Sequence, residues 1–201
     1  MQEEKMQTKT SKPIKLETER LVIRDHVASD FEGLSSLITS EKEMYFLMDI
    51  FAPDLEAVQT NLNTAMAEID LPLRDKYFFA IIEKSSGEYI GEIGFTVLQR
   101  RHADSNVSSL VELGYFIKSD FWGKGLVTEA GEAVIEYIFL SVGIHKITTG
   151  CAKENKASER VMEKLGFVKE ADLSLHQLIH GTWSDRVIYG MTSQQFQLKL
   201  L

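Results

Sequence analysis

The chain has 201 residues, with 22 Lys and Arg against 30 Asp and Glu, a formal net charge of -8, and a single cysteine. Its hydrophobic fraction of 44% and its three prolines predict a packed globular protein and exclude a disordered chain. One cysteine excludes an internal disulfide and a cysteine-based zinc site, which fits a reducing compartment. The negative charge disfavours nucleic acid as a partner and favours cationic partners.

The sequence carries no membrane or export signal that we can identify. Its apolar runs are shorter than the roughly 18 to 20 residues of a membrane-spanning helix, and its polar start has no signal-peptide core. We therefore expect a cytoplasmic protein with no membrane partner. Residues 1–15 have no apolar periodicity and are predicted to form a mobile tail. Residues 16–201 contain no linker or repeat and are predicted to form one domain, as a monomer or a homodimer.

Apolar periodicity defines the elements of this domain. Alternation with period two predicts strands, and apolar residues three and four positions apart predict helices. Ser29 and Glu32 form a capping-box signature for the first helix, and Asp54 opens the second, which is expected to end near Pro72. A polar loop is expected at 100–106. In chain order, the expected elements are strand 21–24, helix 29–38, helix 54–72, strands 77–83, 92–97 and 110–117, helix 127–140, strand 145–151, helix 155–165, and strands 168–179 and 183–190.

The segment from Asp120 to Ala130 lies between an expected strand and an expected helix. Gly123 and Gly125 allow main-chain conformations that other residues avoid, and they carry no side chain that would keep a ligand away. Main-chain N–H groups at a helix N-terminus have no partner inside the helix and attract anions. We therefore predict that this turn binds a pyrophosphate, with Lys124 and Lys118 as countercharges.

Two other phosphate-binding motifs do not fit this segment. A P-loop needs Ser or Thr after its Gly-Lys pair, whereas Gly125 follows Lys124. The dinucleotide-binding fingerprint needs a third glycine where this chain has Thr128, and it expects an early parallel βαβ unit. From the spacing alone, the alternative is a glycine turn that binds no ligand.

The wider segment 113–130 resembles the acyl-CoA pyrophosphate loop of the GNAT N-acetyltransferases, and in particular their ribosomal-protein-acetylating (Rim-type) branch. Residues 155–167 are similar to the second motif of that branch, Asn-x-x-Ser followed by Lys-Leu-Gly-Phe. Residues 16–24 resemble its opening strand, and residues 181–189 resemble its closing hairpin. Asp120 departs from the pattern, because many members have Gln or Arg there. The main chain rather than that side chain is therefore expected to hold the phosphate.

The resemblance implies the GNAT fold, of the α/β (α+β) class, with a mixed, mostly antiparallel twisted sheet of about seven strands flanked by about four helices. It also implies direct transfer of an acetyl group from acetyl-CoA to an amine through a tetrahedral intermediate, without a metal. Main-chain N–H groups near Phe116 and Ile117 would polarise the thioester carbonyl, and Asn155, which also suits a helix N-cap, would hold the pantetheine arm. The expected coenzyme contacts are Phe116, Ile117, Lys118, Trp122, Gly123, Lys124, Gly125, Leu126, Val127, Thr128 and Asn155.

Two residues are the candidates for catalysis. By resemblance, Ser158 hydrogen-bonds to the departing sulfur, although it could instead be a small packing residue beside Val161 and Leu165. Glu112 is the one carboxylate on its expected strand, where partial burial would raise its pKa toward that of a useful base acting through a water. Glu92 is the substitute candidate, and the alternative for both carboxylates is a solvated face of the sheet.

The acceptor is expected to be a primary amine. An α-amino group has a pKa near 7.7 to 8.0 against about 10.4 for lysine, so making it neutral at pH 7 costs about 3.5 kcal/mol less. A site with one carboxylate therefore suits a protein or peptide N-terminus, and the Rim-type resemblance points to a ribosomal protein. The alternatives are the amine of a polyamine or aminoglycoside and, in a different class, a non-catalytic acyl-CoA-binding sensor or interaction module.

Overall fold

The computed structural model describes residues 13–100 and 109–200, so most of the predicted tail and of the predicted polar loop lies outside the described residues. Within these ranges the chain forms eight strands and five α-helices. In chain order they are β1 (Lys15–Glu17), β2 (Leu21–Asp25), α1 (Phe31–Ile38), α2 (Leu55–Met66), β3 (Lys76–Glu83), β4 (Tyr89–Gln99), β5 (Leu110–Ile117), α3 (Leu126–Glu136), β6 (Lys146–Ala152), α4 (Lys156–Leu165), β7 (Val168–Ile179), β8 (Thr182–Thr192) and α5 (Ser193–Lys199). Among the described helices, none has the length and apolar character needed to cross a membrane.

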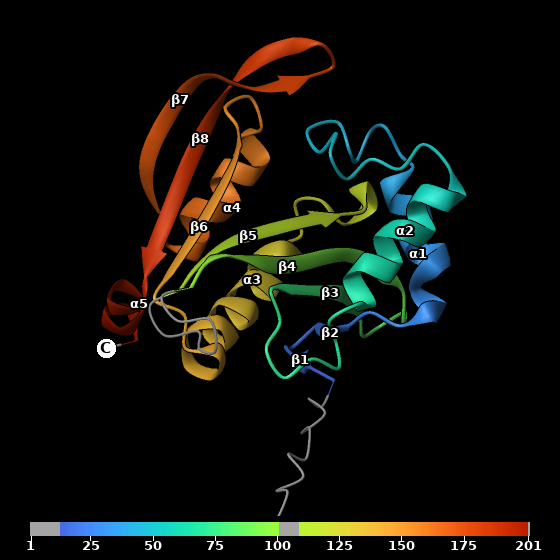
Figure 1. Cartoon of the computed structure of the whole chain (residues 1–201), viewed down its shortest axis with the longest axis horizontal. Helices are drawn as coiled ribbons and strands as arrows, with labels where there is room; N and C mark the ends of the chain where they lie inside the picture. Colours follow the sequence, from blue (N-terminus) through green and yellow to red (C-terminus); the bar gives the residue numbers. More distant parts are fainter. Residues whose placement is uncertain (1–12, 101–108, 201) are drawn as a thin grey trace, which may run out of the picture.

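The described strands form one sheet in the order β1-β2-β3-β4-β5-β6-β8-β7 (Figure 1). Neighbouring strands run antiparallel except β5 and β6, which run parallel. The predicted mixed, mostly antiparallel sheet is therefore confirmed, with β1 and α5 in addition to the expected elements. The single parallel pair joins an N-terminal half of the sheet to a C-terminal half.

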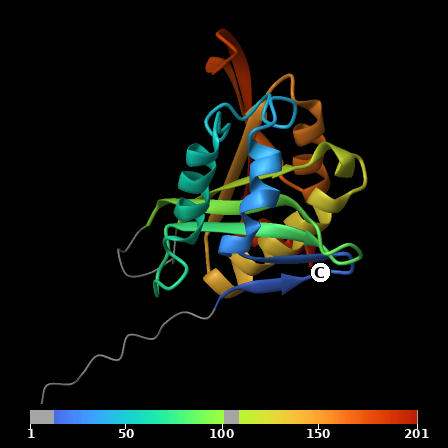
Figure 2. The ribbon, with the colours of Figure 1, turned by 90° about the vertical axis from the view of Figure 1, so that its right-hand side faces the viewer.

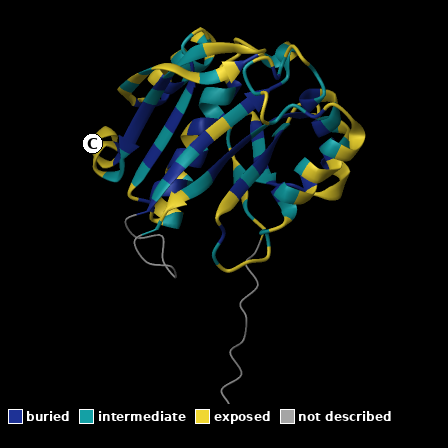
Figure 3. Cartoon of the chain, turned by 45° about the horizontal axis from the view of Figure 1, so that its top comes forward, coloured by how far each residue is buried: buried dark blue, intermediate teal, exposed yellow. Residues whose placement is uncertain are grey.

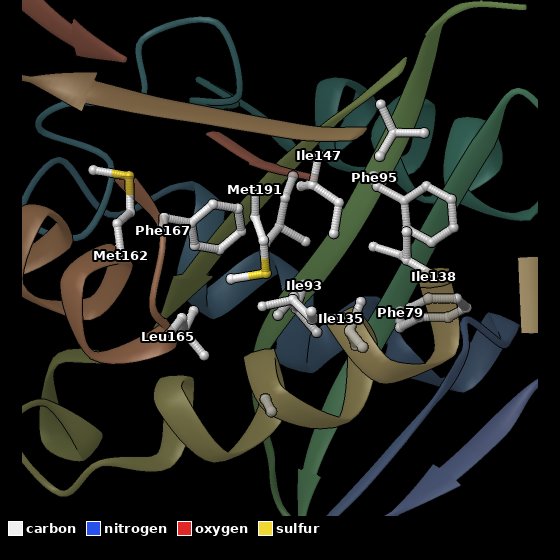
Figure 4. Close-up of a cluster of buried hydrophobic side chains, with 14 of the residues drawn as sticks. Phe79, Ile93, Phe95, Ile135, Ile138, Ile147, Met162, Leu165, Phe167 and Met191 are labelled. Atoms are coloured by element: carbon white, nitrogen blue, oxygen red, sulfur yellow. The ribbon is translucent and has the colours of Figure 1, made fainter. Parts of the chain in front are cut away.

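Helices cover both faces of the sheet (Figure 2). On one face, α1 and α2 pack through buried residues that include Leu34, Leu37, Val58 and Leu62. On the other face, α3 and α4 pack through a second cluster (Figure 4), which includes Phe79, Ile93, Phe95, Ala130, Val134, Ile135, Ile138, Met162 and Leu165. Burying a side chain of this size stabilises the fold by roughly 1.5 to 3 kcal/mol. The junction between β5 and β6 therefore lies in a sheet that is held on both sides.

The alternation predicted for the central strand sorts its side chains between these two faces. In β5, Val111, Leu113 and Ile117 are buried in the cluster under α3 and α4. Glu112 and Gly114 point to the opposite face. Figure 3 shows the same contrast across the molecule, with buried residues along the strands and exposed residues on the outer faces of α1 and α2.

The N-terminal boundary of the domain differs from the prediction. The N–H group of Ile14 donates to Asp25 Oδ2 at 2.7 Å, and the Ile14 carbonyl accepts from the Asp25 N–H group at 3.0 Å. Lys15, which was assigned to the tail, begins β1. A strand of three residues is too short to produce an apolar period, so the sequence pattern could not reveal it.

The predicted start of the first helix was also wrong. Ser29 lies inside a 3-10 turn, Ala28–Asp30, and α1 begins only at Phe31. The carboxylate of Asp30, rather than a Ser29 hydroxyl, satisfies the main chain here, because Asp30 Oδ2 accepts from the Val27 N–H group at 2.9 Å. Asp30 thus makes the bond to the N-cap main chain that was expected from Glu32, with Val27 rather than Ser29 as the N-cap residue.

The ends of the other helices show where tertiary contacts override local pattern. Asp54 caps α2 as predicted, accepting from the Ala57 N–H group at 2.9 Å, but α2 ends at Met66 rather than near Pro72. Beyond α3 the chain continues as a π-helical turn, Tyr137–Val142, that ends at Gly143 with a φ of 79°. The unpredicted α5 is capped by Thr192.

The junction of the two half-sheets is short. β5 and β6 pair only over Leu110–Glu112 and Lys146–Thr148. Beyond these residues the two strands diverge, so that one edge of β5 is left without a neighbouring strand (Figure 1). Main-chain groups along a strand edge that lacks a partner are available to an extended ligand.

Candidate active site

The glycine turn leads from the diverging end of β5 into α3. Gly123 has a φ of 74° and Gly125 a φ of 77°, the left-handed conformation that these glycines predicted. A Cβ atom added at Gly123 would meet nothing within 4 Å. Gly125 is the N-cap of α3 and no side chain caps this helix end. The first N–H groups of α3 are therefore left for an anion, as a pyrophosphate site requires.

The chain's N-terminal region holds this turn in place. Arg20 donates from Nη1 to the Lys124 carbonyl at 3.0 Å and from Nε to Glu129 Oε2 at 2.6 Å. Glu129 also accepts from the Arg20 N–H group at 2.8 Å and from the Thr18 hydroxyl at 2.5 Å. Burial opposes the charged form of Glu129, but the bonds from Thr18 and Arg20 outweigh it and lower its pKa. Residues more than a hundred positions apart thus fix the turn, which no local sequence signal could show.

The countercharges around the turn differ in part from those predicted. Lys124 Nζ lies 4.8 Å from the centre of the Phe121 ring at the turn itself. Lys118 instead forms an ion pair with Glu88 at 2.9 Å, so its charge is largely offset. Lys42, which the sequence did not suggest, donates to the Ser119 hydroxyl at 2.9 Å and lies 5.5 Å from the Trp122 ring.

The alternation of residues along β5 decides which main-chain groups face the edge from which β6 diverges. The Lys118 N–H group donates to the Ile90 carbonyl of β4 at 2.8 Å. Because alternate residues of a strand point their main-chain groups the same way, the N–H and carbonyl groups of Phe116 also face β4. Ile117 faces the opposite edge, where the Trp122 indole N–H group donates to its carbonyl at 2.9 Å. Of the two N–H groups expected to polarise the thioester, that of Ile117 faces the divergence, and that of Phe116 is directed into the sheet.

Asn155 and Ser158 lie at the start of α4, beside the diverging strands. The Asn155 side chain caps α4 by accepting from the Ser158 N–H group at 3.1 Å, as the capping prediction required. The Ser158 hydroxyl lies 3.0 Å from the hydroxyl of Tyr115, which comes from β5. Tyr115 was absent from the sequence-based candidates, and only the contact between β5 and α4 brings it to Ser158.

Glu112 is the last residue of β5 that pairs with β6, and it lies on the face opposite α3. Its side chain is 43% exposed and forms an ion pair with Arg186 of β8 at 2.9 Å. The partial burial expected around this carboxylate is therefore modest, and a cation that the sequence did not pair with it offsets its charge. Two positions along the strand, Gly114 is exposed, and a Cβ atom built on it would meet nothing within 4 Å. Open space therefore adjoins Glu112 on this face.

Glu92, the substitute candidate, has a different environment. Its carboxylate lies 3.0 Å from Nε2 of His26, a side chain with no exposed surface, and Asp30 lies 3.4 Å from Nδ1 of the same ring. Burial opposes the charged form of His26, but the two carboxylates outweigh it and raise its pKa to about 9. Glu92 is thus committed to a buried ion-pair cluster and is 16% exposed, which makes it the poorer candidate for contact with an acceptor.

Cys151 is another potentially reactive side chain near the site, and its surroundings make it unreactive. The Cys151 thiol lies 3.7 Å from the Asn155 carbonyl, and burial raises its pKa, which keeps it protonated. Across the described ranges, no three His, Cys, Asp or Glu side chains gather in a way that could hold a metal ion.

Comparison with known proteins decides the family. A model of the acetyltransferase (GNAT) domain matches residues 20–168. The chain belongs to the GNAT acetyltransferase family. The uncharacterized N-acetyltransferase YoaA of Bacillus subtilis is 26% identical to this GNAT chain over 178 residues, which cover 88% of the chain and 95% of that protein. The [ribosomal protein uS5]-alanine N-acetyltransferase of Escherichia coli is 32% identical over 117 residues, 58% of each protein.

Solved structures give the same fold. The spermidine N-acetyltransferase of Vibrio cholerae, in complex with CoA and spermine, superposes on this GNAT domain with a TM-score of 0.76 at 18% identity, covering 90% of this chain and 99% of that one. The predicted fold and enzyme class are therefore confirmed, and the chain is an acetyl-CoA-dependent N-acetyltransferase. The glycine turn fits the coenzyme, because the helix end has no side-chain cap and the space beside Gly123 is open.

Proposed function

We propose that this chain transfers the acetyl group of acetyl-CoA to the α-amino group of a protein or peptide N-terminus. The observation that carries the proposal is the ion pair between Glu112 and Arg186 beside the open space at Gly114. The guanidinium offsets the charge of Glu112, so this carboxylate offers little net negative charge to a polycation. A singly charged α-amine, which loses its proton more readily, places a smaller demand on such a site.

The coenzyme side of the proposal rests on the opposite end of β5. The α3 N-terminus with Gly123, Lys124 and Gly125 would hold the pyrophosphate, together with Trp122, Leu126, Val127 and Thr128 around the turn. The main chain of Ile117 would hold the thioester carbonyl, and Asn155 would contact the pantetheine arm from α4. Acetyl-CoA supplies the activated acyl group when bound. This chain's residues would orient that group where β5 and β6 diverge, within reach of an amine on the Glu112 face.

The proposed chemistry assigns one task to each of two side chains. Glu112 takes the proton from the acceptor ammonium, through a water, so that a neutral amine attacks the carbonyl. Ser158 stabilises the departing thiolate through its hydroxyl. The relationship to the uS5-alanine N-acetyltransferase of Escherichia coli supports an N-terminal acceptor, although it extends over only 58% of each protein.

A panel of acceptors tests the acceptor class. A peptide with a free N-terminus and an internal lysine is compared with the same peptide acetylated at its N-terminus and with spermidine, by thiol release and by mass spectrometry of the product. We expect release with the free N-terminus only. Faster release with the blocked peptide or with spermidine would contradict the assignment.

The Glu112→Gln variant tests the base. Turnover should fall by about 10²-fold at pH 6.5, where the acceptor is protonated, and by much less at pH 9, where it is neutral. Glu170→Gln is the matched control, because Glu170 is also an ion-paired carboxylate of the sheet, 38% exposed and 2.6 Å from Lys146. An equal loss at both pH values, or a similar loss in the control, would remove Glu112 from the role.

A further inference from the structure

The hydroxyl of Tyr115 makes a contact that the proposed reaction does not yet use. Tyr115 extends from β5 across the point where β5 and β6 diverge, and its ring packs at the margin of the core under α3 and α4. Its hydroxyl lies 3.0 Å from the Ser158 hydroxyl and 3.1 Å from the Ser158 carbonyl. Both oxygens belong to the residue assigned to the departing sulfur, so the tyrosine reaches the reaction through Ser158.

Hydrogen bonds link Tyr115, Ser158, Asn155 and Cys151 in one cluster. The Cys151 thiol donates to the Asn155 carbonyl at 3.7 Å, and the Ser158 N–H group donates to the Asn155 side chain at 3.1 Å. The Tyr115 hydroxyl has one hydrogen and lies near two oxygens of Ser158: the carbonyl, which can only accept, and the hydroxyl, with which either group can be the donor. Burial raises the pKa of Tyr115 well above its usual range, so this hydrogen stays in place at physiological pH. When Tyr115 donates to the Ser158 hydroxyl, the hydroxyl hydrogen of Ser158 remains as a donor for a ligand.

We propose that Tyr115 is a positioning residue that donates its hydroxyl hydrogen to Ser158 and thereby directs the Ser158 hydroxyl hydrogen toward the departing sulfur. The inference deepens the proposed function and rests on it. As the bond from the acetyl carbon to nitrogen forms, the carbon–sulfur bond breaks and sulfur keeps the electron pair. The nitrogen, which is positively charged once its bond to carbon has formed, loses one proton to water. The Ser158 hydroxyl donates a hydrogen bond to the sulfur and keeps its own proton, and the thiolate takes a proton from water.

The alternative is that Tyr115 only packs. The Tyr115→Phe variant separates the two roles, because it keeps the ring and removes the hydroxyl. Tyr189→Phe is the matched control. Tyr189 is a buried tyrosine of the same core, and its hydroxyl also bonds to α4, at 3.1 Å from Glu159 and 3.4 Å from Glu163. Both variants lose one tether between the sheet and α4, but only one loses the contact to Ser158.

A double-mutant cycle provides the test, with kcat and KM measured by thiol release using whichever amine the parent enzyme acetylates. Tyr115→Phe should lower kcat about 10-fold and change the KM for acetyl-CoA less than 2-fold, and Ser158→Ala should lower kcat about 100-fold. The double variant should match Ser158→Ala alone, because Tyr115 acts through that hydroxyl. Tyr189→Phe should keep the parent kcat.

Three results would overturn the inference: a parent-like kcat for Tyr115→Phe, losses that multiply in the double variant, or an equal loss in Tyr189→Phe. The departure of the thiolate is the same for every acceptor. A parent enzyme that acetylates spermidine rather than a peptide therefore refutes the proposed acceptor, while the cycle still decides the role of Tyr115.

Discussion

Gly125→Ala tests the proposed coenzyme site at the N-cap of α3. The new methyl group would meet only Arg20, at 3.7 Å, so the substitution causes no clash within the protein. Its structural cost is the left-handed main chain at a φ of 77°, roughly 1 to 2 kcal/mol. For a domain of this size that cost lowers Tm by about 2 to 8 °C. The methyl group also occupies the space that the glycine leaves for the phosphates, so acetyl-CoA affinity should fall at least 10-fold.

Gly143→Ala is the control for this experiment. Gly143 has a φ of 79°, a Cβ atom there would meet nothing within 4 Å, and it ends the π-helical turn away from the glycine turn. The two variants should therefore lose similar stability without ligand.

Thermal melting with and without acetyl-CoA measures both effects. At a concentration of 100 times the parent Kd, the ligand stabilises the parent and Gly143→Ala by about 2.7 kcal/mol. A 10-fold weaker Kd reduces this gain to about 1.4 kcal/mol in Gly125→Ala. An equal ligand shift in all three proteins would refute the assignment of the turn to the coenzyme.

Three further predictions concern the fold that carries the site. Asp54→Ala removes the cap of α2 and should cost about 1 kcal/mol, read as a lower Tm; an unchanged Tm would show that the cap is dispensable. Arg74→Met leaves Asp25, 3% exposed, without its buried partner at 2.7 Å and should cost about 3 to 5 kcal/mol by urea unfolding; a cost below 1 kcal/mol would contradict this. For Asp30, burial opposes the charged form, but Arg24 and other donors outweigh it and lower the pKa, so this stabilisation is present above about pH 4 and is lost as the pH falls. Asp30→Asn should flatten that acid limb, and an unchanged slope would count against the pairing.

The sequence was sufficient to predict those features of the structure that depend on neighbouring residues. Alternation in β5 and the left-handed glycines at 123 and 125 depend only on neighbouring residues, and both were predicted correctly. The Asn155 cap is also local and was confirmed. These features place the glycine turn between β5 and α3.

The rest depends on pairings between distant residues. The contact of Tyr115 with Ser158 spans 43 positions, and that of Glu112 with Arg186 spans 74. Lys118 was expected to face a phosphate, but it forms an ion pair with Glu88, 30 positions earlier, which offsets its charge. The main-chain direction at Phe116 follows from the parity of pairing with β4, which an apolar pattern does not specify because it reports only the side chains.

The bonds of Arg20 to Lys124 and Glu129 have a consequence for assembly of the protein. They connect the start of the domain to the helix end that is assigned to the phosphates, across 104 and 109 positions. The surroundings of this helix end are complete only after the hairpin of β1 and β2 has packed against α3. That packing requires long-range loop closure. Coenzyme affinity should therefore depend on whether β1 and β2 have packed against α3. A ligand bound at this helix end would slow the detachment of those two strands without contacting them.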